Sequence, residues 1–188
     1  GKEVAFLEDR STIHVINLGT KQVRTVMDGK YEYSYSDGDQ WYQWSPDSRW
    51  ILTNYIGTGG WNNKDVALVN ASGNGEIHNL TQSGYNDTGA KWVLDGKAMI
   101  WESDRAGYRS HGSWGAHGDI YIMFFDLEAY ERFLLTKEEL ALLEESEKKD
   151  DKKEETDKKG KKDAKKEDNK KEEVKALTFD LENCRDRV

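Results

Sequence analysis

The feature that most constrains the fold is an internal repeat with a period of 48 residues. The segment 44–53 recurs as the segment 92–101, and a tryptophan, Trp44 or Trp92, opens each copy. Each copy has the pattern of a strand, a tight turn and a second strand. A repeat of this length indicates a fold that is built from successive copies of one β unit.

The turn inside each copy has its own sequence signal. Asp95 and Gly96 supply the positive φ angles that a tight hairpin turn requires, and Ser48 takes the corresponding position in the first copy, with some strain. The opening residues 2–6 match the second strand of the unit. We therefore expect the first strand of that unit to lie before residue 1.

Two further strands are expected in each unit. Short segments rich in β-branched and aromatic residues, several of them alternating apolar with polar positions, are typical of half-buried antiparallel strands. The third strands are expected at 13–17, 65–70 and 119–125, and the fourth strands at 22–26, 76–81 and 132–136. The unit is thus a four-stranded meander of roughly 48 residues, which is the pattern of a β-propeller blade.

The number of units predicts an incomplete ring. Propellers close with about four to eight blades, whereas this chain carries parts of three and, at 176–180, a segment that resembles the first strand of a fourth. We therefore predict an all-β fold, a partial β-propeller of about three four-stranded antiparallel blades, cut from a longer protein. The expected divisions are a partial blade at 1–28, blades at 29–81 and 82–136, a short helix with a highly charged insertion at 137–175, and the start of the next blade at 176–188.

The insertion has a composition of its own. Thr136 and Glu139 have the spacing of a capping box, and leucines follow, so we expect a helix from about Lys137. From residue 144 to residue 175 the chain holds 13 acidic and 13 basic residues, and like-charge pairs oppose a long helix there. The favoured interpretation is a solvated loop without a function of its own, and an interaction arm is the alternative.

Charge and cysteine content exclude several classes of protein. The balanced tract leaves the whole net charge of −8 on the other residues, and this acidity argues against an electrostatic nucleic-acid binder. The single cysteine, Cys184, excludes an internal disulfide framework and a cysteine-rich metal site. No apolar run approaches the roughly 18 to 20 residues of a membrane span, and the N-terminus lacks the pattern of a signal peptide.

The motifs resemble those of TolB-like and tricorn-type propellers. Trp44–Ile51, which contains a Ser-Pro-Asp turn common to many propellers, and Asp119–Met123 in the next unit carry the general resemblance. More specifically, the segment 109–115, the lysine- and aspartate-rich insertion and the closing segment 181–188 look, in this order, like the second propeller of tricorn-like serine peptidases of bacteria. The similarity runs over nearly the entire chain.

The resemblance implies a function by analogy. Tricorn-like peptidases contain two propellers, a PDZ-type module and a later catalytic domain, and their propellers are thought to filter or channel peptides. This chain would then be a non-catalytic scaffold and gate for peptide substrate and product in a bacterial periplasm or cell envelope. Its partners would be peptides and the other domains of the parent protein. The alternatives are a TolB-like periplasmic interaction propeller without protease activity and, less favoured, the propeller of a prolyl-oligopeptidase-type hydrolase.

No catalytic, metal or cofactor site is expected within the chain. A nucleophile elbow has glycine two residues before its serine and a helix after it, whereas His111 stands two residues before Ser113 and a strand follows. His111 and His117 flank the approach to Asp119, but their spacing fits no standard zinc pattern and no strong third ligand is present.

Loops at one rim form the candidate binding surface. In a four-stranded blade the second-to-third-strand loops and the blade-to-blade connections emerge together, here at 28–40, 57–64 and 103–118, and the charged insertion is expected to leave from this rim. Arginines beside aromatic residues suit peptide carboxylates and apolar side chains. The candidate peptide-binding residues are Trp61, Arg105, Arg109, His111 and Trp114. The alternative is that the aromatic residues pack between blades and the arginines pair with the excess carboxylates.

Three remaining residues have structural interpretations. Trp44 and Trp92 are expected to pack between blades, where truncation of either ring would cost roughly 3 to 5 kcal/mol. Cys184 is expected to be buried only in the intact protein. Because an incomplete propeller leaves strand edges and apolar faces unpaired, the isolated chain is expected to self-associate.

Overall fold

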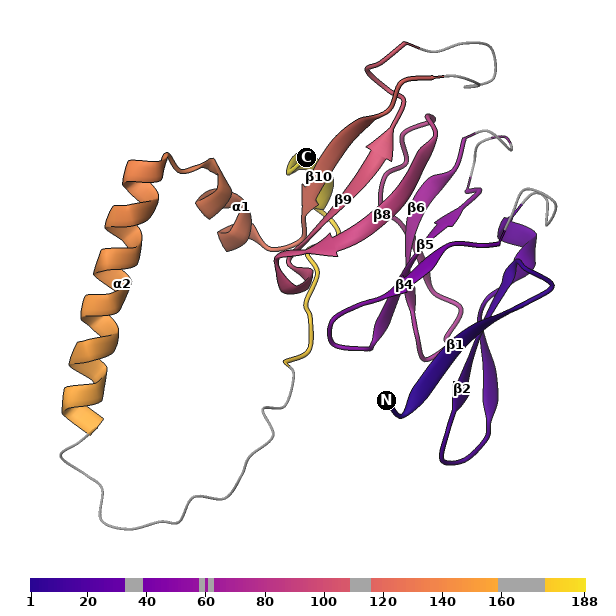
Figure 1. Cartoon of the computed structure of the whole chain (residues 1–188), viewed down its shortest axis with the longest axis horizontal. Helices are drawn as coiled ribbons and strands as arrows, with labels where there is room; N and C mark the ends of the chain where they lie inside the picture. Colours follow the sequence, from indigo (N-terminus) through magenta and orange to yellow (C-terminus); the bar gives the residue numbers. More distant parts are fainter. Residues whose placement is uncertain (33–38, 58–59, 61–62, 109–115, 159–174) are drawn as a thin grey trace. The chain divides into compact units, whose positions relative to one another are not determined.

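The computed structural model describes residues 1–32, 39–57, 60, 63–108, 116–158 and 175–188. They divide into two units, which we describe separately (Figure 1). The sheet unit comprises Gly1–Asp126 and Ala176–Val188, and the helical unit comprises Leu127–Lys175.

The sheet unit is built from three antiparallel sheets in which strands adjacent in sequence pair with each other. Sheet 1 consists of β1 (Glu3–Glu8), β2 (Thr12–Asn17) and β3 (Val23–Met27). Sheet 2 consists of β4 (Tyr42–Trp44), β5 (Trp50–Tyr55), β6 (Asp65–Asn70) and β7 (Ile77–Asn79). Sheet 3 consists of β8 (Asp87–Val93), β9 (Ala98–Ser103) and β10 (Asp119–Phe124). The predicted four-stranded meander is therefore confirmed in sheet 2.

The repeated turns have the predicted backbone. Ser48 has a φ of 59°, and in the second copy Asp95 and Gly96 have φ values of 53° and 91°. In the first copy the Ser45 hydroxyl oxygen accepts hydrogen bonds from the backbone N–H groups of Arg49 (3.3 Å) and Trp50 (3.0 Å). This local bonding holds a non-glycine residue in the left-handed region, which L residues rarely adopt.

Both faces of sheet 2 are buried, because its strands alternate their side chains between two neighbours. Ile51 and Val69 point into a core shared with sheet 1, whereas Leu52 and Leu68 point into a core shared with sheet 3, and all four are fully buried. The first core consists of Ile13, Val15, Val26, Met27, Ile51, Tyr55, Ala67, Val69 and Ala71. The second consists of Leu52, Val66, Leu68, Leu80, Ala90, Met99, Trp101, Met123, Phe125 and Cys184.

The two repeated tryptophans lie in equivalent surroundings. Trp44 on β4 packs against the core between sheets 1 and 2, and Trp92 on β8 packs against the core between sheets 2 and 3. The prediction that both rings pack between successive sheets is confirmed.

Two predictions about the C-terminal segment are wrong. No strand forms at 176–180, and Cys184 is fully buried within this chain. Phe179 and Cys184 instead enter the core between sheets 2 and 3, because the chain returns along the outer edge of β10. There the Phe124 N–H donates to the Arg187 carbonyl oxygen (3.1 Å), and Arg187 Nε donates to the Phe124 carbonyl oxygen (3.1 Å). These hydrogen bonds occupy the outer edge of β10, where the predicted fourth strand was expected to pair.

The predicted fourth strand of sheet 3, at 132–136, is also wrong. The helical unit contains α1 (Leu127–Leu134) and α2 (Lys137–Lys158). At the start of α2 the Glu139 N–H donates to Thr136 Oγ1 (3.3 Å) and the Thr136 N–H donates to Glu139 Oε2 (2.9 Å), which confirms the capping box. The helix runs to Lys158, well into the charged tract for which a loop was favoured, and residues 159–174 lie outside the described part.

The missing fourth strand changes where the insertion leaves the sheet unit. We name the end that carries the turns 18–22, 45–49, 71–76 and 94–97 the hairpin end, and the opposite end the loop end. The N–H groups of Phe125 and Asp126 donate to the Lys97 carbonyl oxygen (2.8 and 3.3 Å), which places the exit at the hairpin end. The prediction of an exit from the rim of 103–118 is wrong, because the chain leaves after three strands rather than four.

Both ends of the insertion meet at the same turn. The 3-10 turn η3 (Leu94–Gly96) adjoins Asp126 through Lys97, and a Cβ atom on Gly96 would lie 2.6 Å from Leu177 Cδ1. The insertion therefore begins and ends beside one hairpin. Among the described helices, none is both long and apolar enough to cross a membrane.

Candidate functional site

Of the five candidate binding residues, the structure describes Arg105. Trp61, Arg109, His111 and Trp114 lie outside the described residues. The peptide-binding role of these five residues stays a prediction.

Arg105 is engaged within the fold at the loop end. Its guanidinium lies 4.5 Å from the ring centroid of Tyr121 and 5.6 Å from that of Trp101, which is cation–π geometry. Its Nη2 is 3.6 Å from Oδ2 of Asp87, a fully buried carboxylate, and its Nε donates to Ser103 Oγ at 3.2 Å. These contacts favour the structural interpretation for this arginine.

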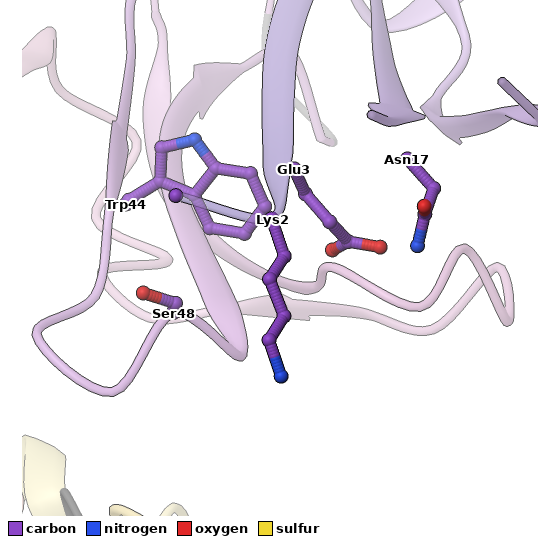
Figure 2. Close-up of a pocket in the computed structure, with 6 residues that line it drawn as sticks. Lys2, Glu3, Asn17, Trp44 and Ser48 are labelled. Carbon is purple, nitrogen blue, oxygen red and sulfur yellow. The ribbon is translucent and has the colours of Figure 1, made fainter. Parts of the chain in front are cut away.

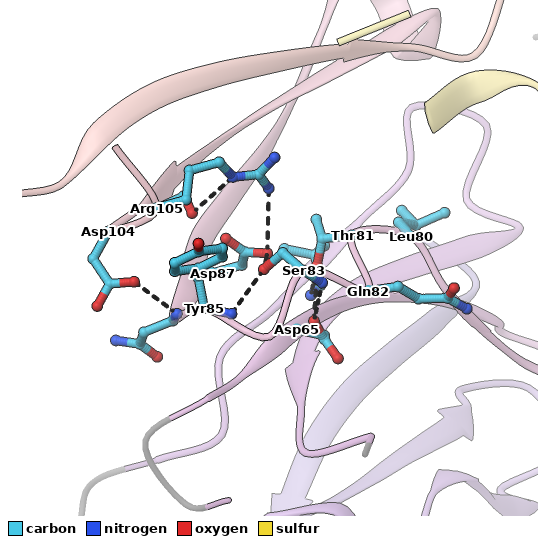
Figure 3. A network of polar contacts seen from close by, with 12 residues as sticks. Asp65, Leu80, Thr81, Gln82, Ser83, Tyr85, Asp87, Asp104 and Arg105 are labelled. Atoms are coloured by element: carbon cyan, nitrogen blue, oxygen red, sulfur yellow. Dashed lines mark hydrogen bonds and ion pairs between the residues drawn. The ribbon is translucent and has the colours of Figure 1, made fainter. Parts of the chain in front are cut away.

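The arginine belongs to a polar network that joins sheets 2 and 3 (Figure 3). Ser83 Oγ donates to Asp87 Oδ2 (2.5 Å) and the Ser83 N–H donates to Asp65 Oδ1 (3.2 Å). The Asn86 N–H donates to Asp104 Oδ1 (3.0 Å). The carboxylates of Asp65, Asp87 and Asp104 are at most 5% exposed. The hydrogen bonds that they accept therefore hold the segment between β7 and β8 in place. In the described part of the chain no group of three or more His, Cys, Asp or Glu residues has the geometry for a metal ion.

Two adjoining hollows lie at the opposite, hairpin end. The first has a volume of about 560 Å³ and is lined by Gly1, Lys2, Glu3, Asn17, Trp44 and Ser48 (Figure 2). The second has a volume of about 500 Å³ and is lined by Glu3, Arg24, Ser48, Arg49, Trp50, Asn70, Ala71, Ser72 and Leu177. Because they share Glu3 and Ser48, they form one groove, which we name the hairpin groove.

A fixed ion pair stands in the middle of this groove. Arg24 Nη1 and Nη2 donate to the two carboxylate oxygens of Glu3, each at 2.7 Å, and Arg24 Nε donates to the Ala71 carbonyl oxygen at 2.8 Å. The hydrogen bonds from Arg24 lower the pKa of Glu3, and the same bonds raise the pKa of Arg24. The pair thus stays charged and ties β1 to β3 and to the turn after β6.

The rest of the groove combines aromatic surface with free charge. The Trp44 ring forms one wall, the exposed Lys2 ammonium lies at the mouth of the first hollow, and Trp50 and Arg49 line the second. Apolar walls with a few polar and charged groups are typical of ligand sites. The polar and charged groups that the two hollows offer for binding are those of Lys2, Glu3, Ser48 and Arg49.

Sequence reasoning missed the hairpin groove and favoured the loop end. Its lining residues come from segments as distant as Gly1 and Leu177, and Trp44 was assigned to the core alone. No short sequence pattern marks the groove, because its walls come from segments that are far apart in the sequence.

No protein-family model matches the chain, and no curated protein matches it.

Proposed function

We propose that the sheet unit is a segment of a β-propeller that serves as a non-catalytic scaffold and peptide gate in a tricorn-like serine peptidase. Equivalent packing of successive sheets supports the propeller. The strands β1, β5 and β9 are equivalent, and Ile51 and Met99, the second residues of β5 and β9, both point toward the preceding sheet and are fully buried. Sheets that repeat such contacts around an axis form a propeller.

The observation that carries the proposal is the apolar surface at both ends of the stack. Val4, the equivalent of Ile51 on β1, is 45% exposed. Ile120, the second residue of β10, is 69% exposed, whereas its equivalents Ile13 and Val66 are fully buried. Positions that are buried inside the stack are thus open on its outer faces, as expected if further blades cover both faces in a larger ring.

The hairpin groove supports the binding part of the proposal. Lys2 and Arg49 offer cations for peptide carboxylates, and Trp44 and Trp50 offer apolar surface for side chains. The Glu3 carboxylate lies between the two hollows, where it can accept hydrogen bonds from peptide N–H groups.

A binding assay tests this function. Fluorescein-labelled hexapeptides with free carboxylates are titrated with the full chain at low salt, and fluorescence anisotropy reports binding. Lys2→Glu should weaken binding by about tenfold, since a charge contact of this kind is worth roughly 1 kcal/mol or slightly more. Lys91→Glu, an equally exposed lysine on sheet 3, is the matched control and should leave binding unchanged.

The outcomes separate this function from its rival. Absence of binding by every peptide, or equal loss in both variants, contradicts the peptide gate. Binding of a folded protein partner without any binding of peptides would favour the TolB-like interaction propeller instead.

A further inference from the structure

The helical unit carries a groove between α1 and α2, and we propose that this groove binds a basic amphipathic helix of a partner protein. The insertion is then an interaction arm rather than a loop without a function of its own. This role goes beyond the proposed peptide gate and does not depend on it, because every residue that lines the groove lies between Glu128 and Glu147.

The groove follows one face of each helix. It has a volume of about 420 Å³ and is lined by Glu128, Glu131, Arg132 and Leu135 on and just after α1, and by Glu139, Leu143 and Glu147 on α2. The first set has the spacing i, i+3, i+4 and i+7, and the second has the spacing i, i+4 and i+8, so each set shares a face of its helix. A groove along two helices is the place that a third helix takes in a bundle.

The rim of the groove is acidic. Four glutamates and one arginine line it, which leaves three negative charges in excess. Arg132 Nη1 donates to Glu147 Oε1 at 2.6 Å, and this bond, followed by the charges of Glu147 and Glu128, raises the pKa of Arg132. The one cation of the lining is thus already engaged, and Glu128 and Glu131, exposed one turn apart on α1, are the carboxylates that a ligand meets.

The floor of the groove is apolar. Leu135 and Leu143 line it, and both side chains are half-buried, so part of their surface is open to a ligand. Covering this surface supplies affinity that exposed charge contacts alone do not supply. An apolar floor between charged rims suits one face of an amphipathic helix.

The charge of the helical unit selects the occupant. From residue 127 to residue 147 the chain holds seven acidic and two basic residues. A second copy of this segment would bring like charges together, and a nucleic acid or an anionic membrane would be repelled in the same way. A helix with an apolar stripe flanked by lysine or arginine complements both the floor and the rim.

The size of the groove limits the contact to about two turns of the ligand. The eight residues of α1 span about 12 Å, which is the length over which a parallel helix can touch it. Apolar ligand side chains at i and i+4 would cover Leu135 and Leu143, and the flanking cations would reach Glu128 and Glu131.

The first experiment varies the ligand. The probe is a rhodamine-labelled peptide of about three helical turns, with leucines in one stripe and lysines on both sides of it, and anisotropy with the full chain gives its affinity. A peptide of the same composition whose leucines no longer share a face should bind at least about fivefold more weakly, and replacing every lysine by glutamate should abolish binding. Binding of the lysine probe should weaken as salt is added, because charges at an exposed rim are screened.

The second experiment changes the rim with matched pairs of substitutions at physiological salt. Glu128→Gln with Glu131→Gln should weaken binding of the lysine probe by about tenfold, because two exposed charge contacts are lost. Glu138→Gln with Glu145→Gln removes the same charge from exposed positions of α2 outside the groove, and should change binding by less than about twofold.

The third experiment changes the floor. Leu143→Ala should weaken binding about fivefold, because a ligand side chain loses the surface that it covers. Leu142→Ala is the matched control, since Leu142 lies outside the groove and is 68% exposed, and it should bind as the wild type does.

A charge swap separates direct contact from loss of structure. Glu128→Lys with Glu131→Lys should bind the glutamate form of the probe and lose the lysine form. A variant whose helices had merely unfolded would bind neither form.

Several results would overturn the proposal. Equal binding of the rearranged peptide, or equal effects of the groove pair and the control pair, would mean non-specific attraction to an acidic chain. Binding that appears only after deletion of residues 159–174 would assign the groove to the lysine-rich tract of the chain itself. Self-association that the groove pair abolishes and the control pair leaves intact would assign it to a second copy. The peptide gate is tested separately by Lys2→Glu, so it stands or fails independently of these results.

Discussion

Replacing Phe179 by alanine tests whether the C-terminal segment is part of the core between sheets 2 and 3. The Phe179 ring lies 5.4 Å from the Trp50 centroid, 5.8 Å from Trp92 and 5.1 Å from Phe125. Two of these contacts, with Trp50 and Phe125, are edge-to-face at interplanar angles of 88° and 77°. One ring from the end of the chain thus joins aromatic residues of both sheets.

The expected loss of stability follows from these contacts. Removing a phenylalanine ring from a packed interior costs about 3 to 5 kcal/mol, and Phe179 is partly buried, so we expect a value near the lower end, about 3 kcal/mol. For a domain of this size the loss corresponds to a fall in melting temperature of about 6 to 12 °C. Urea unfolding followed by tryptophan fluorescence measures it directly, because Trp50 and Trp92 flank the site.

Phe133→Ala is the matched control. Phe133 lies on α1 and is 60% exposed, so the same substitution there should change the free energy of unfolding by less than about 0.5 kcal/mol. A loss below about 1 kcal/mol for Phe179→Ala, or equal losses in the two variants, would refute the assignment of the C-terminal segment to the cooperative core.

Four other outcomes are expected. The first replaces residues 127–175 by a Gly-Ser linker of about six residues, which spans at most roughly 20 Å. Because both ends of the replaced segment meet at one turn, the β-sheet circular dichroism should stay unchanged, and loss of the β signal would contradict this. Because its arginine partner lowers the pKa of Glu3, the pair stabilises the fold fully above the unfolded pKa of about 4.3, and the stabilisation is lost as the pH falls through the lower folded value. Glu3→Gln should therefore reduce the free energy of unfolding by about 1 kcal/mol at pH 7 and have less effect in acid, and an effect independent of pH in urea titrations would count against the pair. Burial raises the pKa of the Cys184 thiol, so a disulfide reagent should label it at least about a hundredfold faster in urea than in the native chain, whereas rapid native labelling would place it at the surface. Phe6→Glu and Ile120→Glu, on the two outer faces, should each reduce self-association in sedimentation experiments, and wild-type behaviour in both would exclude these faces as the contact.

The sequence predicted those elements whose signal is local. The two hairpin turns were found because Ser48 and the Asp95-Gly96 pair have turn chemistry of their own, and the start of α2 because Thr136 and Glu139 bond to each other. Trp44 and Trp92 were assigned correctly because a repeated position implies a repeated environment.

The errors share one physical cause, which is dependence on distant partners. The segments 132–136 and 176–180 are short and largely apolar, and the hydrophobic periodicity of such segments does not distinguish a strand from a helix or a loop. Their structure depends on which backbone lies nearby. Arg187 already bonds to the outer edge of β10, so no strand at 132–136 pairs there, and the chain that follows β10 forms α1 (Leu127–Leu134) instead. The hairpin groove was missed for the same reason, since its walls come from both ends of the chain.

The burial of sheet 2 between two neighbours makes the sheet unit behave as a short one-dimensional array, in which each layer senses the layer beside it. Within the same two strands, Ile51 and Val69 pack toward sheet 1 on one face of sheet 2, and Leu52 and Leu68 pack toward sheet 3 on the other. A substitution in β5 or β6 that loosens the packing on one face therefore alters strands that also carry the core on the other face, so its cost in stability is shared by both neighbouring sheets.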